Sequence, residues 1–186
     1  IAVAAEYLLH QPDIYSPKAQ KLAIVDLDLH HGNGTQEIFW QRADVFYLST
    51  HQQPLYPYSG SLEETGAGGG DGLILPLLDR YQPEMILVSY GYDPHWMDPL
   101  GSLLLSAGGY GKLAAKLAGW ADQHCGGKIA WFLEGGYDPE AAQACSLAVV
   151  AALLGQPWQD PLGPAPYAET SSWRRMVERA QDIWSL

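Results

Sequence analysis

Hydrophobic residues gather in four short and nearly continuous runs along the chain, and stretches with helical spacing separate these runs. The runs cover 21–29, 44–50, 85–91 and 128–136. Continuous runs of this length, rich in Val, Ile, Leu and aromatic residues, are typical of strands buried on both faces, as in parallel sheets. We therefore predict four buried parallel strands.

The stretches between and around these strands predict helices. They cover 1–10, 34–41, 72–81, 109–124, 139–155 and 171–184, and Pro76 is an unfavourable residue for the interior of the third. Helices that alternate with parallel strands form βαβ units, which build an open sheet covered on both faces. The fold class is thus α/β, a three-layer, doubly wound and mostly parallel sheet.

Polar residues follow the end of each predicted strand. The motifs are DLDLHHGNG at 26–34, LSTH at 48–51, SYGYDPHWMDPLG at 89–101 and LEGGYD at 133–138. Ligands of open α/β sheets bind beyond the carboxyl ends of the strands. We expect these four motifs to meet at one functional site.

Two carboxylates and one imidazole in these motifs indicate a metal site. In extended chain Asp26, Asp28 and His30 face the same side, so Asp28 and His30 can reach one point, and Asp93 offers a third ligand. Three such ligands with one place left for water are typical of catalytic zinc, although iron or manganese accept the same donors. Taken singly, the aspartates could instead cap helices or form salt bridges, and the histidine could be structural.

Tyr137 in LEGGYD is a candidate catalytic group. The two preceding glycines allow the backbone to approach a substrate, and the phenol could donate a hydrogen bond to a developing oxyanion. The alternative is an ordinary tyrosine after a glycine turn. Only its place beside the metal motifs favours the catalytic role.

Composition narrows the classes of partner. The chain has 21 acidic and 10 basic residues, a net charge of −11, which argues against nucleic acid as a partner. Cys125 and Cys145 form no CxxC pair, which indicates a reducing, cytoplasmic compartment and neither a disulfide framework nor a cysteine zinc site. No apolar run has the length of a membrane span, so we expect no membrane partner.

Three motifs in this order, DLDLHHGNGT, GYDPHWMDPLG and LEGGYD, resemble the histone deacetylase and acetylpolyamine amidohydrolase superfamily. The Asn of HHGNGT and the Glu of LEGGY are similar to its class II and bacterial deacetylase-like branch. The resemblance extends from residue 1 to about 158 and implies an arginase/deacetylase-like fold. It also implies a zinc-dependent enzyme that removes acetyl or another short acyl group from an acetylated lysine peptide, a polyamine or a small acetylated amine, with an oligomer possible.

The resemblance assigns roles to individual residues. It implies one Zn²⁺ per chain on Asp28, His30 and Asp93, with Tyr137 as the phenol that stabilises the transition state. A structural K⁺ or Na⁺ beside the zinc would be bound by Asp26, Ser49 and Thr50 together with Asp28 and His30.

The remaining implied contacts are weaker matches. A second cation would bind backbone carbonyls around Phe39, Arg42 and Val45. Tyr56, Leu100 and Gly136 would line the acyl-lysine tunnel.

The chain departs from this family in two places. The adjacent histidine pair of a Gly-His-His motif, which serves the family as base and acid, does not occur in it, and His51 and His95 are the nearest substitutes. Of the two substitute histidines, His95 is expected to shape the pocket entrance and not to act as a base. The family also has a further strand and a longer helix near the GAGGG segment. We therefore expect 1–186 to be a single catalytic domain that lacks its N-terminal part and a segment near 70–71, with a chain break at Gly70–Asp71.

Two other functions remain open from these residues. One is a catalytically inert fragment that binds metal and recognises acyl-lysine or acts as a scaffold. The other is an arginase-type ureohydrolase, which would need a two-manganese site with more carboxylates than the motifs offer.

Overall fold

A four-stranded parallel sheet forms the centre of the structure, as the apolar runs predict. The computed structural model describes all residues except 11–18, 63, 65–73, 169–171 and 186. In the described part of the chain the strand order is β2-β1-β3-β4, and every pair of neighbours is parallel. The strands are β1 (Leu22–Asp26), β2 (Val45–Ser49), β3 (Met85–Tyr90) and β4 (Ile129–Leu133). The prediction that all four are buried was wrong for β4, which lies at the edge of the sheet, is half-buried and ends at the exposed Leu133.

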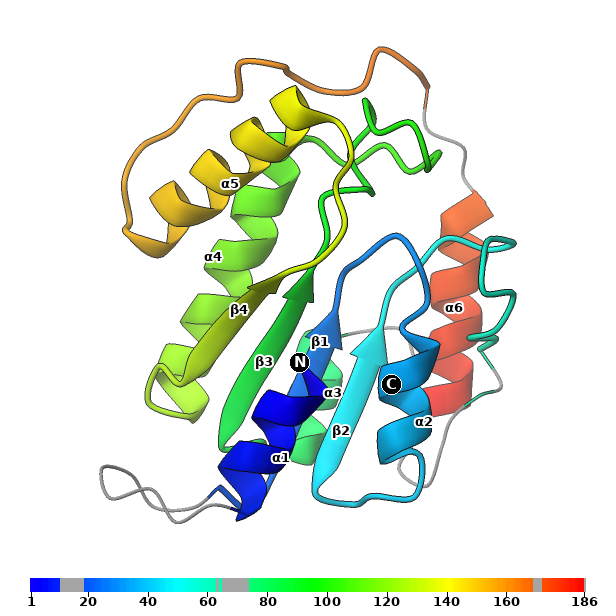
Figure 1. Cartoon of the computed structure of the whole chain (residues 1–186), viewed down its shortest axis with the longest axis vertical. Helices are drawn as coiled ribbons and strands as arrows, with labels where there is room; N and C mark the ends of the chain where they lie inside the picture. Colours follow the sequence, from blue (N-terminus) through cyan, green and yellow to red (C-terminus); the bar gives the residue numbers. More distant parts are fainter. Residues whose placement is uncertain (11–18, 63, 65–73, 169–171, 186) are drawn as a thin grey trace.

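All four strands point the same way, so their carboxyl ends lie along one edge (Figure 1). The pairing register aligns these ends, because Asp26 of β1 lies opposite Ser49 of β2 and Ser89 of β3. At the other side of β3, Tyr90 lies opposite Leu133 of β4. The motifs that follow the strands therefore start from neighbouring positions.

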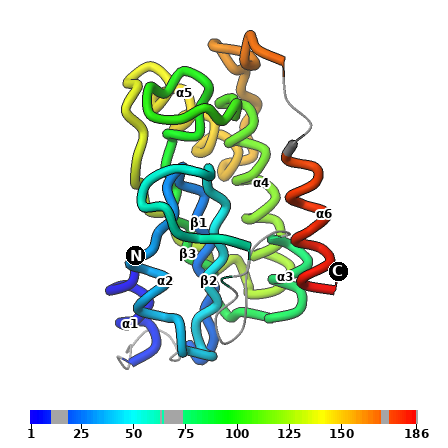
Figure 2. The backbone as a smooth tube through the Cα atoms, turned by 90° about the vertical axis from the view of Figure 1, so that its right-hand side faces the viewer, coloured from blue at the N-terminus to red at the C-terminus, as the bar shows by residue number. Residues whose placement is uncertain are grey.

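Helices cover both faces of the sheet, which confirms the three-layer prediction (Figure 2). Apolar side chains of α1 and α2 pack on one face with Leu22 and Ile24 of β1, and those of α3, α4 and α5 pack on the other face with Ala23 and Val25. Trp184 of α6 also packs on this second face. The helices are α1 (Ala2–His10), α2 (Asn33–Phe39), α3 (Ile74–Tyr81), α4 (Ala107–His124), α5 (Pro139–Leu153) and α6 (Ser172–Trp184).

The local sequence explains where several helices begin. Ser106 caps α4 by accepting a hydrogen bond from the Gly109 N–H (3.1 Å), and Asp138 caps α5 by accepting from the Ala141 N–H (2.8 Å). Pro76 lies in the first turn of α3, where a missing N–H leaves no helical hydrogen bond unmade. The expectation that Pro76 is unfavourable in this helix was therefore wrong.

The first strand is shorter than predicted, since it ends at Asp26 and not at Leu29. The strand ends there because the Asp26 and Asp28 carboxylates accept hydrogen bonds from the N–H groups of Asp28 and His30, which turn the chain away from the sheet. The break predicted at Gly70–Asp71 lies outside the described residues. Among the helices in the described part of the chain, none combines the length and the apolar character that crossing a membrane requires.

The interior of α4 offers a stabilising substitution at Gly119. A Cβ at this position would meet no atom within 4 Å, whereas a Cβ at Gly111 would lie 3.2 Å from the Ala148 carbonyl oxygen of α5. Gly119→Ala should therefore raise the free energy of unfolding by about 0.5–1 kcal/mol, because alanine loses less conformational entropy in a helix. Gly111→Ala is the matched control, and in denaturant unfolding it should gain less or lose stability.

Candidate metal centre and active site

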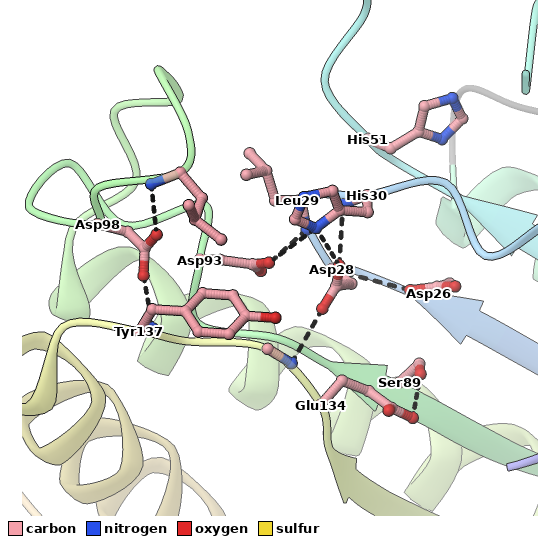
Figure 3. Close-up of polar contacts among 12 residues, drawn as sticks. Asp26, Asp28, Leu29, His30, His51, Ser89, Asp93, Asp98, Glu134 and Tyr137 are labelled. Atoms are coloured by element: carbon pink, nitrogen blue, oxygen red, sulfur yellow. Dashed lines mark hydrogen bonds and ion pairs between the residues drawn. The ribbon is translucent and has the colours of Figure 1, made fainter. Parts of the chain in front are cut away.

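Three side chains that follow β1 and β3 converge at the carboxyl edge of the sheet. One ligand atom from each of Asp28, His30 and Asp93 can be chosen so that all lie within 4.8 Å of one another (Figure 3). In the described part of the chain this is the one group of His, Cys, Asp and Glu side chains close enough to hold a metal ion. These are the three residues that the motifs predicted as ligands.

Asp28 and His30 reach this position through bends, not through an extended strand. The Asp26 carboxylate accepts a hydrogen bond from the Asp28 N–H (3.2 Å), and the Asp28 carboxylate accepts from the His30 N–H (2.8 Å). Such bonds to the backbone two residues ahead turn the chain away from the ladder. The prediction that the alternation of an extended chain aligns these side chains was wrong, because β1 has already ended.

The two carboxylates also tie together the segments that follow three strands. Asp93 Oδ1 accepts a hydrogen bond from the Leu29 N–H (3.0 Å), which joins the segments after β3 and β1. Asp28 Oδ2 accepts from the Gly135 N–H (3.1 Å), which joins the segments after β1 and β4. The backbone of three strand ends thus holds in place the three candidate metal ligands, Asp28, His30 and Asp93, which we call the metal cluster.

The electrostatics of the cluster favour a bound cation. Asp93 is fully buried, and this burial, followed by the charge of Asp28, raises the pKa of its carboxyl to about 6. The His30 Nδ1 atom lies 3.0 Å from Asp93 Oδ2 and 3.3 Å from Asp28 Oδ1. A divalent cation among these three groups would offset the repulsion between the carboxylates.

Two glycines leave room for the carboxylates. A Cβ at Gly135 would lie 2.5 Å from Asp93 Oδ2 and 3.0 Å from Asp28 Oδ2, and a Cβ at Gly91 would lie 2.7 Å from Asp93 Oδ1. Any other residue at these positions would push the carboxylates out of place. The donor set, its spacing and this glycine cradle together fit a divalent cation with nitrogen and oxygen ligands.

Asp26 lies beside this cluster and faces β2. It is 4% exposed and accepts a hydrogen bond from the Tyr47 hydroxyl (2.8 Å), and burial raises its pKa to about 7. The Thr50 N–H donates to the Asp26 carbonyl (2.9 Å), while the Ser49 hydroxyl lies 2.8 Å from His51 Nδ1. These residues adjoin one another, and the monovalent cation assigned to them stays a prediction.

The histidines considered as proton acceptors are engaged in other contacts. His51 Nε2 lies 2.9 Å from the Gly60 carbonyl oxygen, and its ring lies beside that of His31, with centroids 4.7 Å apart and planes tilted by 39°. His95 is 1% exposed, and its Nδ1 accepts a hydrogen bond from the Met97 N–H (3.2 Å). The role of His95 in shaping a pocket entrance stays a prediction.

Tyr137 follows β4 and directs its phenol toward the metal cluster. Figure 3 shows the ring running beside Asp93 with its hydroxyl toward Asp28. Partial desolvation, together with the negative charges of Asp93 and Asp28, raises the pKa of the phenol. The hydroxyl therefore keeps its proton near neutral pH and can act as a hydrogen-bond donor.

The other predicted positions do not belong to the group formed by Asp28, His30 and Asp93. Tyr56 and Leu100 are exposed, and Gly136 adopts a positive φ of 130° against Tyr92, where a Cβ would lie 2.9 Å from the Tyr92 Cβ. The substrate contacts of these residues stay predictions. So does the second cation at Phe39, Arg42 and Val45, which lie between the end of α2 and the start of β2, the end of that strand away from Asp28.

The sequence assigned no role at the site to Asp98, Ser89 or Glu134, although Glu134 is the Glu of LEGGY that carries part of the family resemblance. Asp98 is 5% exposed and accepts hydrogen bonds from two loops. The Ser89 hydroxyl donates to Glu134 (2.8 Å) and joins the ends of β3 and β4. One signal for Asp98 was available, because an aspartate before proline favours a turn that its carboxylate caps.

Known proteins similar to this chain share both its sequence and its fold. The model of the histone deacetylase domain matches residues 1–75 and 71–153, two segments that meet where the sequence predicted an interruption; that prediction remains open. Histone deacetylase 10, chloroplastic, of Oryza sativa subsp. japonica is 35% identical over 214 residues, which cover 100% of this chain and 47% of the relative. A probable deacetylase of Archaeoglobus fulgidus is 34% identical, with coverage of 94% and 54%.

Solved structures agree with these matches. The structure of the HDA15 HD domain matches this chain with a TM-score of 0.74 at 31% identity, and the match covers 89% of this chain and 51% of the HDA15 chain. The histone deacetylase Clr3 has a TM-score of 0.83 at 26% identity, with coverage of 99% and 34%. The chain thus spans about half the length of the first relatives it matches.

Proposed function

Because the chain belongs to the histone deacetylase domain family, we propose that it carries the metal site of a zinc-dependent amidohydrolase. The reaction is removal of acetyl or another short acyl group from an acetylated amine. The observation that carries the proposal is the convergence of Asp28, His30 and Asp93 beside a phenol that keeps its proton. This arrangement combines a metal ligand set with a hydrogen-bond donor for an oxyanion.

In this proposal Asp28, His30 and Asp93 hold the zinc. When bound, zinc polarises an amide carbonyl and makes water a better nucleophile near neutral pH. The backbone bonds from Leu29 and Gly135 orient the two carboxylates, so that the ligand set is formed before the metal binds. Asp26, Ser49 and Thr50, with Asp28 and His30, would hold the neighbouring K⁺ or Na⁺.

Tyr137 stabilises the negative charge that develops on the substrate carbonyl oxygen. Its hydroxyl donates a hydrogen bond that is stronger in the transition state than in the ground state, which is the property that raises kcat. Tyr56, Leu100 and Gly136 line the tunnel through which the acylated amine enters.

The substrate class follows from the relatives only in outline. A bacterial relative, from Pseudomonas aeruginosa, is named a histone deacetylase-like amidohydrolase; it is 33% identical, with coverage of 73% of this chain and 42% of the relative. The archaeal relative is named a probable deacetylase. These names support acetylated lysine peptides, acetylated polyamines and small acetylated amines as the substrates to compare.

The test is a substrate panel with the intact protein loaded with zinc. Release of acetate from acetyl-lysine peptides and from acetylated polyamines should be measured with and without a chelator, and one class should be hydrolysed only in the metal-loaded state. A protein that binds zinc and an acetyl-lysine peptide without turnover would instead support the inert acyl-lysine-binding function. A protein that retains no zinc would contradict both.

A further inference from the structure

Asp98 is a buried carboxylate that lies outside the metal cluster and joins two loops of the site. It belongs to the loop between β3 and α4, and Figure 3 shows it beside the backbone of Tyr137. We propose that Asp98 is a positioning residue for the reaction, which holds the backbone of Tyr137 so that the phenol faces the metal cluster. This inference rests on the proposed function and assigns the element that orients its oxyanion donor.

Each oxygen of the Asp98 carboxylate has its own backbone partner. Oδ2 accepts a hydrogen bond from the Tyr137 N–H (2.7 Å), and Oδ1 accepts from the Leu100 N–H (3.0 Å). The first bond joins the loop after β3 to the turn after β4, and the second closes a turn within the loop after β3. The Asp98 carboxylate therefore fixes the backbone of Tyr137 and the backbone of Leu100 relative to each other.

Few packing contacts hold the side chain of Tyr137, so the place of the phenol depends on the backbone. The side chain is 56% exposed, so packing restrains the ring weakly. Its position is therefore set by the backbone, which is fixed on both sides of the residue. Before it, the Gly135 carbonyl accepts from the Tyr92 N–H (2.8 Å), and after it, Asp138 caps α5.

An aspartate suits this task better than its amide. Ionised aspartate offers two acceptor oxygens and no donor, which matches two converging N–H groups. Asparagine keeps the shape but offers one oxygen, so its NH₂ group would face one of the two N–H donors. Asp98→Asn therefore loosens one loop or both while changing little of the volume of this buried side chain.

The chain offers a matched control in Asp160. Its carboxylate also bridges two segments: Oδ2 accepts from the Gly108 N–H (2.7 Å), and Oδ1 accepts from the Leu162 and Gly163 N–H groups (3.0 and 3.1 Å). None of these bonds reaches the metal cluster or Tyr137. Asp160→Asn should lower stability in the way that Asp98→Asn does and should leave kcat unchanged.

The decisive kinetic test is a double-mutant cycle in the intact, zinc-loaded protein. Asp98→Asn should lower kcat by about 10- to 100-fold, with a smaller change in KM and a full equivalent of zinc, because misplacing a reacting group by about 1 Å has effects of this size. In a Tyr137→Phe background the same substitution should lower kcat by less than about 2-fold, because no hydroxyl is left to position. An equal loss in both backgrounds would mean a merely structural role.

Two measurements decide the inference without turnover. Hydrogen exchange of the Tyr137 and Leu100 amides should become faster in Asp98→Asn and stay unchanged in Asp160→Asn. A peptide trifluoromethyl ketone, whose hydrate resembles the tetrahedral intermediate, should bind about 10-fold more weakly to Asp98→Asn and to Tyr137→Phe, without a further loss in the double variant. If no substrate is hydrolysed, the proposed function fails while these two results still decide the role of Asp98; unchanged exchange or unchanged affinity overturns it.

Discussion

Asp93→Asn is expected to remove the bound metal and the activity together. Asparagine preserves the shape of the side chain and can still accept the Leu29 hydrogen bond, but it takes away one of two anionic ligands. Loss of a partner that only supports a metal ligand weakens metal binding by about 10- to 100-fold, so loss of a ligand should exceed about 100-fold. Metal analysis after dialysis should find far less than one equivalent of zinc.

Thermal unfolding separates this effect from misfolding. In the metal-free protein Asp93→Asn should unfold at the same or a higher temperature, since it removes one of two neighbouring carboxylates from a fully buried position. Added zinc should raise the midpoint of the parent protein and leave that of the variant unchanged, because only binding to the folded state stabilises it. A variant that keeps one full equivalent of zinc would exclude Asp93 from the ligand set.

The fold was predictable because its sheet is parallel and three of its strands are buried. Strands covered on both faces are continuous apolar runs, and all four runs lie within a few residues of the observed bounds, although the edge strand β4 is only half-buried. Helix α5 begins at the predicted residue 139, after the cap residue Asp138, whereas α4 begins at Ala107, two residues before the predicted 109, because Ser106 caps it. Strand order was less accessible, because pairing depends on contacts between segments far apart in the chain.

The metal cluster was predictable for a different reason. Asp28, His30 and Asp93 follow strands whose carboxyl ends must share one edge, so a common site at that edge was expected, and the pairing of β1 with β3 brings the three side chains together. The local geometry did not follow, because it depends on whether Asp26 and Asp28 bond to backbone N–H groups. Competition between such bonds and the strand ladder is decided by a small free-energy difference that the sequence pattern does not reveal.

Asp98 marks the limit of inference from the sequence. Its partner Tyr137 lies 39 residues away, and the bond between them depends on the shape of two irregular loops. Hydrophobic periodicity carries no information about such loops, in which each polar side chain has its own hydrogen-bond partners. The structure was needed to show that a carboxylate outside the ligand set bonds to the backbone of the candidate catalytic residue.

Tyr137→Phe is expected to lower kcat by about 10²–10³-fold while leaving KM and the metal content nearly unchanged. The substitution deletes one hydroxyl from an exposed ring, so the fold and the cluster of Asp28, His30 and Asp93 should persist. Loss of a single oxyanion donor has this magnitude in subtilisin, and it acts on kcat because the bond is made in the transition state.

A second exposed tyrosine provides the control for this variant. Tyr167 is 65% exposed and lies in the irregular segment after α5, outside the motifs that follow the four strands, so Tyr167→Phe deletes the same hydroxyl from a residue with no predicted role at the site. Steady-state kinetics on the best substrate of the panel should give parent values for Tyr167→Phe and the large kcat loss for Tyr137→Phe. If Tyr137→Phe turns over at the parent rate with full zinc, its phenol plays no part in stabilising the oxyanion, and the charge must be met by the metal alone.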